Sequence, residues 1–510
     1  MRKTSLRLRL VAVVVVGAIF WIGRHHRTAL PTATATASAT ATIARAAAPA
    51  RVIRRGEVQL TECELKAPHS AAPPAHAYCA VLEVPENRAR PSARQVTLHL
   101  AVIPSQAARP AADAVTFLDG GPGGAALADY PLVAQSFAPL QKARDILLID
   151  QRGTGQSNPL QCPPAQNTEL LARVRACAAH VATRADPRYY TTADASADLE
   201  AVRVQLGYPQ LTVIGVSYGT RVAQIYARDY PRSVRALVLD SPVPNTLVLG
   251  SEHARNLENT LQARFQACVA DSPCKARFQN PYATLSALSA RLEAHPIDVT
   301  VADPITHAIR TEHLTRASVA QLVRFYAYSP LSMALLPLTL DEAQAGRYTP
   351  LLTQLLQVEG DLSTRLEGGM ELSVLCTEDA PLLREDPADA HTVLGSAFVR
   401  QAQQACTAWP HAPMPAHFHD PLTGAVPTLL LSGELDPVTP PRYAQAIADH
   451  LSQARVLTLP GQGHAVMGVG CAPEVVARFV AKADAATLDA HCLARERAAP
   501  FFLDYAGPSP

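Results

Sequence analysis

The chain has 510 residues, of which 48% are hydrophobic, and its 45 Lys and Arg residues almost balance its 44 Asp and Glu residues. This composition supports a sizeable core. The formal net charge of +1 argues against a nucleic-acid partner, which would normally need a basic patch or stripe. The length allows one large domain with an insertion, or two or three domains.

Residues 1–39 indicate an export signal. The first nine residues carry four basic side chains, Leu10 to Ile22 form an apolar run, and Ala37-Ser38-Ala39 offers a cleavage site. The run is short for a membrane span, which needs about 20 residues. A basic cluster behind it suggests the alternative of an uncleaved amino-terminal anchor. In both cases the body of the protein is expected to be secreted or periplasmic. Residues 40–56 are predicted to be a disordered linker, because they contain few large apolar side chains.

The chain has ten cysteines, an even number that suits disulfides in an oxidising compartment. They fall along the chain in neighbouring couples, so pairing in sequence order is the simplest hypothesis, although sequence alone does not fix connectivity. Buried free thiols are the alternative. Metal binding is disfavoured, because the spacings match no zinc pattern. The couples are Cys63 with Cys79, Cys162 with Cys177, Cys268 with Cys274, Cys376 with Cys406, and Cys471 with Cys492.

Short apolar runs follow one another from about residue 96. Val96 to Ile103 and Ala114 to Leu118 are predicted as strands, and the second leads directly into the glycine-rich segment 119–124. So many glycines after a buried strand allow a loop backbone to approach a ligand closely. Ile146 to Asp150 is predicted as the next strand.

The following run, Leu211 to Val216, ends in the pattern Gly215-x-Ser217-x-Gly219, and a helix-like stretch comes next. A strand, a tight turn and a helix form the setting that a nucleophile elbow needs. The two glycines remove side chains where the strand and helix backbones crowd each other. Because this pattern also arises by chance in long chains, other parts of the sequence must support Ser217 as the nucleophile.

Strands that alternate with helices predict an α/β fold with a mostly parallel sheet covered by helices on both faces. Residues 57–244 carry the first part of this core. From 245 to 420 the strand pattern stops and helical periodicity takes over, which predicts a mainly helical cap inserted after the strand that ends at Asp240. Strand-like runs then return, so residues 421–510 are predicted to complete the core.

The late strand-like runs supply candidates for the other catalytic groups. A serine hydroxyl needs an adjacent base, and the base needs a third group to hold its tautomer. In α/β hydrolases these groups follow in the order Ser, Asp or Glu, His. Asp436 and His464 each follow a late strand, which places them at the same sheet edge as Ser217, where ligands bind in open α/β sheets. Glu434 is the competing acid, but Asp436 is preferred because it lies further along the turn.

Stabilising the oxyanion of acyl transfer requires two preorganised N–H donors. One is predicted to be the amide of Tyr218, directly after the nucleophile. The other is predicted to come from the Gly120-Gly121 loop after the early strand, with Gly121 as the donor.

Three motifs in chain order resemble those of proline iminopeptidases. Asp119-Gly120-Gly121-Pro122-Gly123 resembles the family's His-Gly-Gly-Pro-Gly loop, residues 150–157 match its Asp-Gln-Arg-Gly-x-Gly-x-Ser signature, and residues 215–219 resemble its nucleophile elbow. Residues 433–471 resemble the tripeptidyl-aminopeptidase-like end of secreted bacterial relatives. The resemblance spans about residues 57–486. It departs at Asp119, where the family usually has a histidine outside the triad.

The resemblance implies the α/β-hydrolase fold and an exopeptidase that releases residues from a free amino terminus. Such an enzyme must recognise a protonated amine, and carboxylates near the cap suit that role. Glu378 and Asp379 are the predicted amine-binding residues, while Glu252, Glu258 and Glu371 stay open as alternatives.

The predicted function is therefore an exported serine aminopeptidase that acts through an acyl-enzyme on Ser217 and binds a peptide with a free amino terminus. No cofactor, metal or nucleic acid is expected, and a membrane only through the amino-terminal segment. Arg152 is expected to brace the glycine loop rather than to act in catalysis. A carboxylesterase or acyl hydrolase of the same fold is the first alternative, because fold does not settle function. A non-catalytic binding protein is the second.

Overall fold

The computed structural model describes residues 50–163 and 169–508. The predicted export signal at residues 1–39 and most of the predicted linker lie outside the described residues. The last part of that linker is instead strand β1 (Val52–Arg55), which pairs antiparallel with β2. The prediction that the disordered linker extends to residue 56 is therefore wrong for its last residues. A turn at Gly56, with a φ of 51°, folds this segment onto the sheet. No helix of the described part is long and apolar enough to cross a bilayer.

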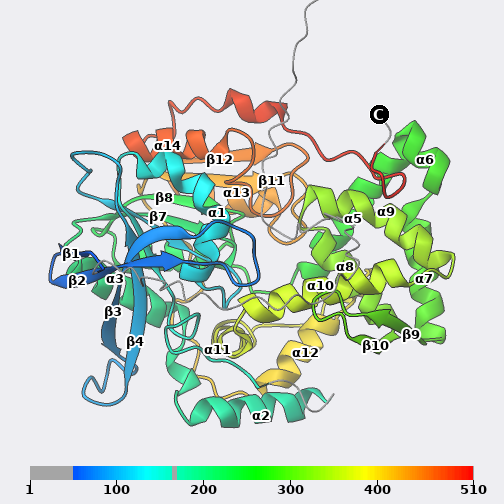
Figure 1. The fold of residues 1–510 in the computed structure, drawn as a ribbon, viewed down its shortest axis with the longest axis horizontal. Helices are drawn as coiled ribbons and strands as arrows, with labels where there is room; N and C mark the ends of the chain where they lie inside the picture. Colours follow the sequence, from blue (N-terminus) through cyan, green and yellow to red (C-terminus); the bar gives the residue numbers. More distant parts are fainter. Residues whose placement is uncertain (1–49, 164–168, 509–510) are drawn as a thin grey trace, which may run out of the picture.

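One sheet runs through the molecule, with the strand order β1-β2-β3-β4-β6-β5-β7-β8-β11-β12 (Figure 1). The strands from β1 to β4 pair antiparallel, and β4 also pairs antiparallel with β6. From β6 to β12 all neighbours run parallel. The further strand bounds are β2 Val58–Leu65, β3 Ala75–Pro85, β4 Gln95–Ile103, β5 Ala114–Leu118, β6 Ile146–Ile149, β7 Leu211–Val216, β8 Val234–Asp240, β11 Thr428–Gly433 and β12 Ala454–Leu459.

Helices cover both faces of the parallel part of this sheet. Strands β5 to β8 and β11 are buried along nearly their whole length, so they need apolar cover on both sides. Helices α1 and α14 share a hydrophobic core with one face, and α3, α4 and α13 share another with the opposite face. The predicted α/β architecture is confirmed. The bounds are α1 Ala126–Gln141, α3 Thr192–Gln205, α4 Tyr218–Asp229, α13 Pro441–Ala448 and α14 Ala472–Lys482.

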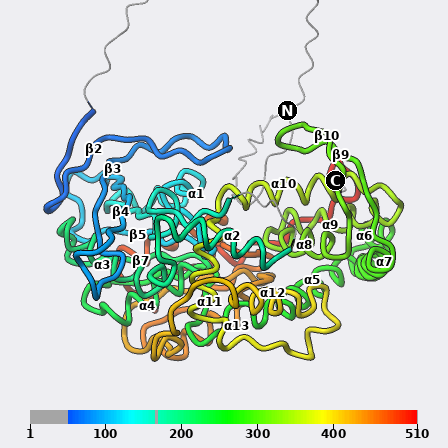
Figure 2. The backbone as a smooth tube through the Cα atoms, turned by 90° about the horizontal axis from the view of Figure 1, so that it is seen from below, coloured from blue at the N-terminus to red at the C-terminus, as the bar shows by residue number. Residues whose placement is uncertain are grey.

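The segment between β8 and β11 forms the cap, with its own hydrophobic core. Both views show helices α5 to α10 gathered beside the sheet (Figures 1 and 2). The cap also contains an antiparallel hairpin that the sequence pattern did not indicate, β9 (Ile297–Ala302) with β10 (Ile309–Leu314). Helix α2 (Leu170–Ala182) packs against α11 and α12. The cap helices are α5 His253–Ala270, α6 Ser272–Phe278, α7 Pro281–Ala294, α8 Arg316–Tyr326, α9 Pro330–Gln344, α10 Thr349–Arg365, α11 Gly368–Glu378 and α12 Ala397–Cys406.

The carboxyl-terminal segment leaves the core and packs against the cap, although residues 421–510 as a whole were predicted to complete the core. The guanidinium of Arg264 lies 3.9 Å from the centre of the Phe501 ring. The amide of Phe502 donates to the carbonyl of Ala334 at 3.2 Å. This segment therefore ties the end of the chain to the cap.

The cysteines form the five disulfides of the sequence-order hypothesis, which is thereby confirmed. No cysteine of the described part is free. The Cys376–Cys406 bond joins the ends of α11 and α12. It holds the helix that carries several of the cap acids considered below.

Candidate active site

Ser217 occupies a sharp turn between β7 and α4. Its backbone has a φ of 54° and a ψ of −123°, a conformation that residues with side chains rarely adopt. A Cβ at Gly215 would lie 2.4 Å from the Gly219 carbonyl oxygen, and a Cβ at Gly219 would lie 2.2 Å from the Leu118 carbonyl oxygen. Both positions therefore require glycine, and the turn holds Ser217 at the carboxyl end of β7, as in a nucleophile elbow.

Asp436 and His464 come from the neighbouring loops after β11 and β12. The Nδ1 atom of His464 lies 2.8 Å from Oδ2 of Asp436. The same carboxylate accepts two amides and one hydroxyl from the turn 438–439. The competing acid Glu434 instead accepts the amide of Gly461 at 2.7 Å. The structure therefore pairs His464 with Asp436, which leaves Nε2 of the ring available as a base.

The environment of this pair favours opposite charges. Burial by itself raises the pKa of the Asp436 carboxyl, but the His464 ring and the turn amides outweigh burial, so the pKa is lowered overall. Burial also opposes a charge on His464, yet the carboxylate of Asp436 raises the pKa of the ring above its ordinary value. A carboxylate placed in this way stabilises the imidazolium that forms when the base takes a proton.

Asp240, at the end of β8, connects the elbow to the His464 loop. Its carbonyl accepts the amide of Ser217 at 3.0 Å. Its carboxylate accepts the amides of Val466 and Met467, each at 2.8 Å. Sequence reasoning missed this residue. The available signal was an acid directly after a buried parallel strand that follows the nucleophile strand.

The serine and the histidine reach the same edge of the sheet but are not directly bonded. Within the described ranges, the hydrogen bonds of the His464 side chain run to Asp436 and Thr439 and not to Ser217. Catalytic hydrogen bonds often tighten only in complex with substrate. The elbow and the His464 loop are held together by Asp240 instead.

Gly121 and Tyr218 line the same cavity as Ser217. Neither amide donates a hydrogen bond to any other described residue. A Cβ at Gly120 would lie 3.1 Å from the Cβ of Ser217, so the glycine loop lies directly against the elbow. Two unpaired N–H groups beside a serine are what an oxyanion hole requires.

The cavity lies between the core loops and the cap and is mainly apolar. Burial lowers the pKa of His253 to about 3, so this ring is neutral. Glu371 has a solvent-exposed surface, but the atoms that surround its carboxyl group remove part of the hydration of that group, which raises its pKa, while the charge of Arg324 opposes the rise. The guanidinium of Arg324 lies 5.6 Å from the centre of the Phe398 ring. The lining residues are Gly121, Pro122, Ser217, Tyr218, Val243, Leu247, Leu249, His253, Arg324, Tyr328, Glu371, Leu375, Phe398, Val438 and Thr439.

Glu378 and Asp379 do not line this cavity, which corrects the prediction that they bind the substrate amine. Glu378 is fully buried and accepts the amide and the hydroxyl of Thr192 at 2.6 and 2.7 Å. The Thr192 hydroxyl also lies 2.7 Å from the Tyr218 hydroxyl. Asp379 is equally buried and pairs with Arg221 of the elbow helix at 2.9 Å. The end of α11 is turned into the core, so both acids hold the cap against the elbow.

Among the other cap acids considered, Glu371 is the one that reaches the cavity. Glu252 pairs with Arg442 at 2.7 Å, and Glu258 accepts the amide of Val393 at 3.2 Å. In the part of the chain that the structure describes, no cluster of His, Cys, Asp or Glu side chains could hold a metal ion.

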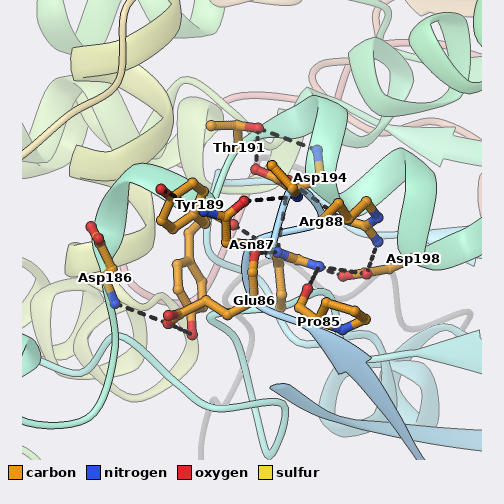
Figure 3. A network of polar contacts seen from close by, with 12 residues as sticks. Pro85, Glu86, Asn87, Arg88, Asp186, Tyr189, Thr191, Asp194 and Asp198 are labelled. Atoms are coloured by element: carbon orange, nitrogen blue, oxygen red, sulfur yellow. Dashed lines mark hydrogen bonds and ion pairs between the residues drawn. The ribbon is translucent and has the colours of Figure 1, made fainter. Parts of the chain in front are cut away.

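Arg152 is fully buried and braces its own loop after β6, whereas the expected contact with the glycine loop 119–124 is not among its hydrogen bonds or ion pairs to the described residues. It forms two 2.6 Å hydrogen bonds to the carboxylate of Asp198 on α3. It also donates to the carbonyls of Glu86 and Tyr189, at 3.0 and 2.8 Å. Figure 3 shows the surrounding network, in which Arg88 also reaches Asp198. These contacts tie the loop after β6 to β3 and α3, away from the cavity.

Two family models match the chain. One, described as the alpha/beta hydrolase fold, matches residues 113–314, and the other, described as TAP-like protein, matches residues 391–492. The first range contains Ser217, and the second contains Asp436 and His464.

Named relatives align with most or part of the chain. The serine protease Hip1 of Mycobacterium tuberculosis is 25% identical over 521 residues, which cover 93% of this chain and 94% of that protein. The tripeptidyl aminopeptidase of Streptomyces coelicolor is 31% identical over 189 residues, 32% of this chain and 35% of that protein. A probable proline iminopeptidase of the same species is 32% identical over 163 residues, 32% of this chain and 43% of that protein.

Proposed function

Because the chain belongs to the α/β hydrolases and carries a TAP-like carboxyl-terminal region, we propose that it is a serine aminopeptidase. It releases residues or short peptides from a free amino terminus through an acyl-enzyme on Ser217. The observation that carries this proposal is a single cavity that holds Ser217, the unpaired amides of Gly121 and Tyr218, and the carboxylate of Glu371.

The proposed reaction begins when Oγ of Ser217 attacks the scissile carbonyl carbon and Nε2 of His464 takes the hydroxyl proton. Asp436 holds the ring through Nδ1 and stabilises its charge. The tetrahedral oxyanion accepts the amides of Gly121 and Tyr218. His464 then gives its proton to the leaving amine as the C–N bond breaks. A water molecule, deprotonated by the same ring, hydrolyses the acyl-enzyme.

We assign recognition of the substrate amine to Glu371 in place of the buried acids at the end of α11. A free amino terminus is a cation, and a carboxylate that lines the cavity can bind it through a charge-assisted hydrogen bond. The neighbouring Arg324 favours the ionised form of Glu371 by opposing the rise in its pKa. The apolar walls, including Leu247 and Phe398, suit a substrate with apolar side chains near its amino terminus.

We further propose that the protein acts outside the cytoplasm. The basic and apolar amino-terminal sequence at residues 1–39 supports export. The pairing of all ten cysteines supports an oxidising compartment. Fractionation of cells that express the full chain tests this: the protein is expected in the periplasmic or culture fraction.

A panel of chromogenic amides tests the peptidase proposal. Aminoacyl, dipeptidyl and tripeptidyl amides are compared in free and amino-blocked form, with Ser217→Ala as the control. The proposal expects free amides to be cleaved, blocked amides to be poor substrates, and Ser217→Ala to be inactive. Equal cleavage of blocked substrates would defeat amine recognition.

Two other outcomes would redirect the assignment. Faster turnover of short acyl esters than of any free peptide amide favours a carboxylesterase or acyl hydrolase. A fluorophosphonate probe that fails to label wild type, or labels Ser217→Ala equally, removes the catalytic role of Ser217 and favours a binding protein.

A further inference from the structure

Asp119 lies between β5 and the glycine loop and contacts that loop directly. Its Oδ1 accepts the amide of Gly120 at 2.7 Å. Its Oδ2 is buried and receives no N–H or O–H donor from the described residues. A Cβ at Gly124 would lie 2.8 Å from this Oδ2, so the loop closes tightly around the carboxyl group. One oxygen therefore fixes the loop, and the other needs a partner.

That partner is a second carboxyl group, Asp129 on α1. It lies within hydrogen-bonding reach of Asp119 and is itself buried. Two carboxylates this close cannot both be ionised without strong repulsion, so such a pair shares one proton. Burial, reinforced by Asp129, raises the pKa of Asp119 well above its ordinary value. The proton that the pair holds therefore keeps the two acids from both being charged.

The pair is tied to the cap. Nε of Arg365, the last residue of α10, lies 2.9 Å from Oδ1 of Asp129. Two residues later, the amide of Glu367 donates to the carbonyl of Gly123 at 3.1 Å. A Cβ at Gly123 would lie 2.9 Å from both the nitrogen and the carbonyl oxygen of Glu367. The cap therefore rests on the glycine loop through side chains and backbone together.

We propose that Asp119 and Asp129 form a proton-sharing carboxyl pair that positions the Gly120-Gly121 loop, with Arg365 linking the pair to the cap. The pair does not touch the reacting atoms. It acts through the loop that supplies the Gly121 amide, so this proposal rests on the proposed oxyanion role of Gly121. It gives a purpose to Asp119, the position at which the chain departs from the histidine of proline iminopeptidases.

The Asp119–Asp129 pair is expected to respond to a rise in pH. Arg365 on α10 acts on both acids of the pair, and Asp150 after β6 interacts electrostatically with Asp129. Asp129, Asp150 and Arg365 line a cavity whose other titratable residues are Glu64, Lys66, His99 and Glu367. When Asp119 loses its proton at high pH, two carboxylates face one guanidinium, and the hydrogen bond between them is lost. The loop then loosens, and the turnover rate falls on the alkaline side.

Three variants of the full chain test the proposal. Asp119→Ala removes the pair, and Asp119→Asn mimics the protonated acid, because its amide donates to Asp129 at every pH. Asp145→Asn is the matched control, a buried acid directly before β6, at the amino end of that strand and away from the glycine loop. The readouts are kcat and KM on the best free amide, the rate of fluorophosphonate labelling of Ser217, and Tm, each between pH 6 and 10 (roughly the range in which a buried carboxyl of raised pKa titrates).

Asp119→Ala is expected to lower kcat and the labelling rate about 10- to 100-fold with little change in KM, since a misplaced oxyanion donor weakens only the transition state. Asp119→Asn is expected to restore most of this loss and to remove the alkaline fall in rate. The wild-type Tm should fall as pH rises, and the Asp119→Asn variant should lack that part of the fall.

The proposal is overturned if Asp119→Ala matches Asp145→Asn in kcat and labelling, or if Asp119→Asn keeps the wild-type alkaline fall. If Asp119→Ala does not fold, the comparison of the pH profiles of wild type and Asp119→Asn is sufficient to test the proposal. A wild type that is labelled but cleaves no peptide defeats the peptidase proposal while leaving this comparison intact. If no labelling occurs, the dependence of Tm on pH still decides whether the carboxyl pair exists.

Discussion

The amide of Ser217 donates to the carbonyl of Asp240, and the carboxylate of Asp240 holds the loop that carries His464. One residue of β8 therefore sets the distance between the proposed nucleophile and the proposed base. Burial raises the pKa of the Asp240 carboxyl to about 6, while the amides of Val466 and Met467 oppose the rise. Asp240 is thus mainly ionised at neutral pH, and its two oxygens satisfy both amides.

Asp240→Asn should reduce both stability and turnover. The asparagine oxygen can accept one amide, but its NH₂ group faces the other, and a buried unsatisfied N–H costs about 1–3 kcal/mol of unfolding free energy. A displaced His464 loop should lower kcat about 10- to 100-fold. Urea unfolding and steady-state kinetics measure the two effects. Asp113→Asn, a buried acid next to the amino end of β5, should lower stability without the loss in kcat.

Asp436→Asn should change the pH profile as well as the rate. The asparagine holds His464 in the wrong tautomer, so kcat should fall about 10⁴-fold. The base must be neutral to act, so wild-type activity falls as pH drops through the pKa of His464, which the carboxylate raises. Without that carboxylate the acid limb of kcat/KM should move to lower pH. An acid limb that stays in place would mean that it reports another group.

The sequence predicted best those strands whose residues are almost all apolar. Strands such as Ala114–Leu118 and Leu211–Val216 are short apolar runs, because both of their faces are covered by helices. The early strand Val58–Leu65 was missed, because only its first half alternates between buried apolar and exposed polar residues and it has no continuous apolar run. The hairpin strand Ile309–Leu314 is almost wholly exposed and carries no apolar run at all.

Prediction of the site was limited for a related reason. The pairing of Asp436 with His464 follows from chain order and strand ends, which are properties of the sequence. The roles of Glu371 and Glu378 do not, because both lie on α11 seven residues apart, and tertiary packing decides which of them meets the cavity. Asp240 was missed because the partners of its carboxylate lie more than 200 residues away along the chain.

Glu378→Gln should make the fold less sensitive to pH. Burial, reinforced by Asp379, raises the pKa of Glu378 to about 8, although the hydrogen bonds from Thr192 oppose the rise. A carboxyl group with a raised folded-state pKa contributes stability that is complete below its unfolded pKa of about 4.3 and is lost as pH rises through its folded value. Glutamine mimics the protonated acid: its oxygen accepts the Thr192 amide, and its NH₂ donates to the Thr192 hydroxyl, which reverses the direction of that one bond.

Wild type should therefore lose more unfolding free energy than Glu378→Gln between about pH 4.5 and 8, as followed by urea unfolding at several pH values. The exposed pair of Glu342 with Arg347 offers a control, since Glu342→Gln removes a carboxylate whose pKa is lowered. Parallel stability curves for wild type and Glu378→Gln would show that Glu378 is ionised in the fold.

Glu371→Gln should separate amine recognition from chemistry. Glutamine keeps the size of the side chain but loses the charge that is proposed to hold the substrate ammonium. KM for a free aminoacyl amide should rise about 10- to 100-fold, since a charge-assisted hydrogen bond contributes about 1.5–3 kcal/mol. Labelling of Ser217 by a fluorophosphonate should change little, because that probe carries no amine.

Glu378→Gln is the matched control for this kinetic test, since it removes a carboxyl group from the same helix outside the cavity. Its KM for free amides should stay close to that of wild type. The comparison also covers amino-blocked amides, on which Glu371→Gln should lose nothing, because they present no cation. A KM that rises equally on free and blocked substrates would assign Glu371 to the shape of the cavity rather than to the amine. A rise with Glu378→Gln instead would return the amine site to the end of α11, against the burial observed there.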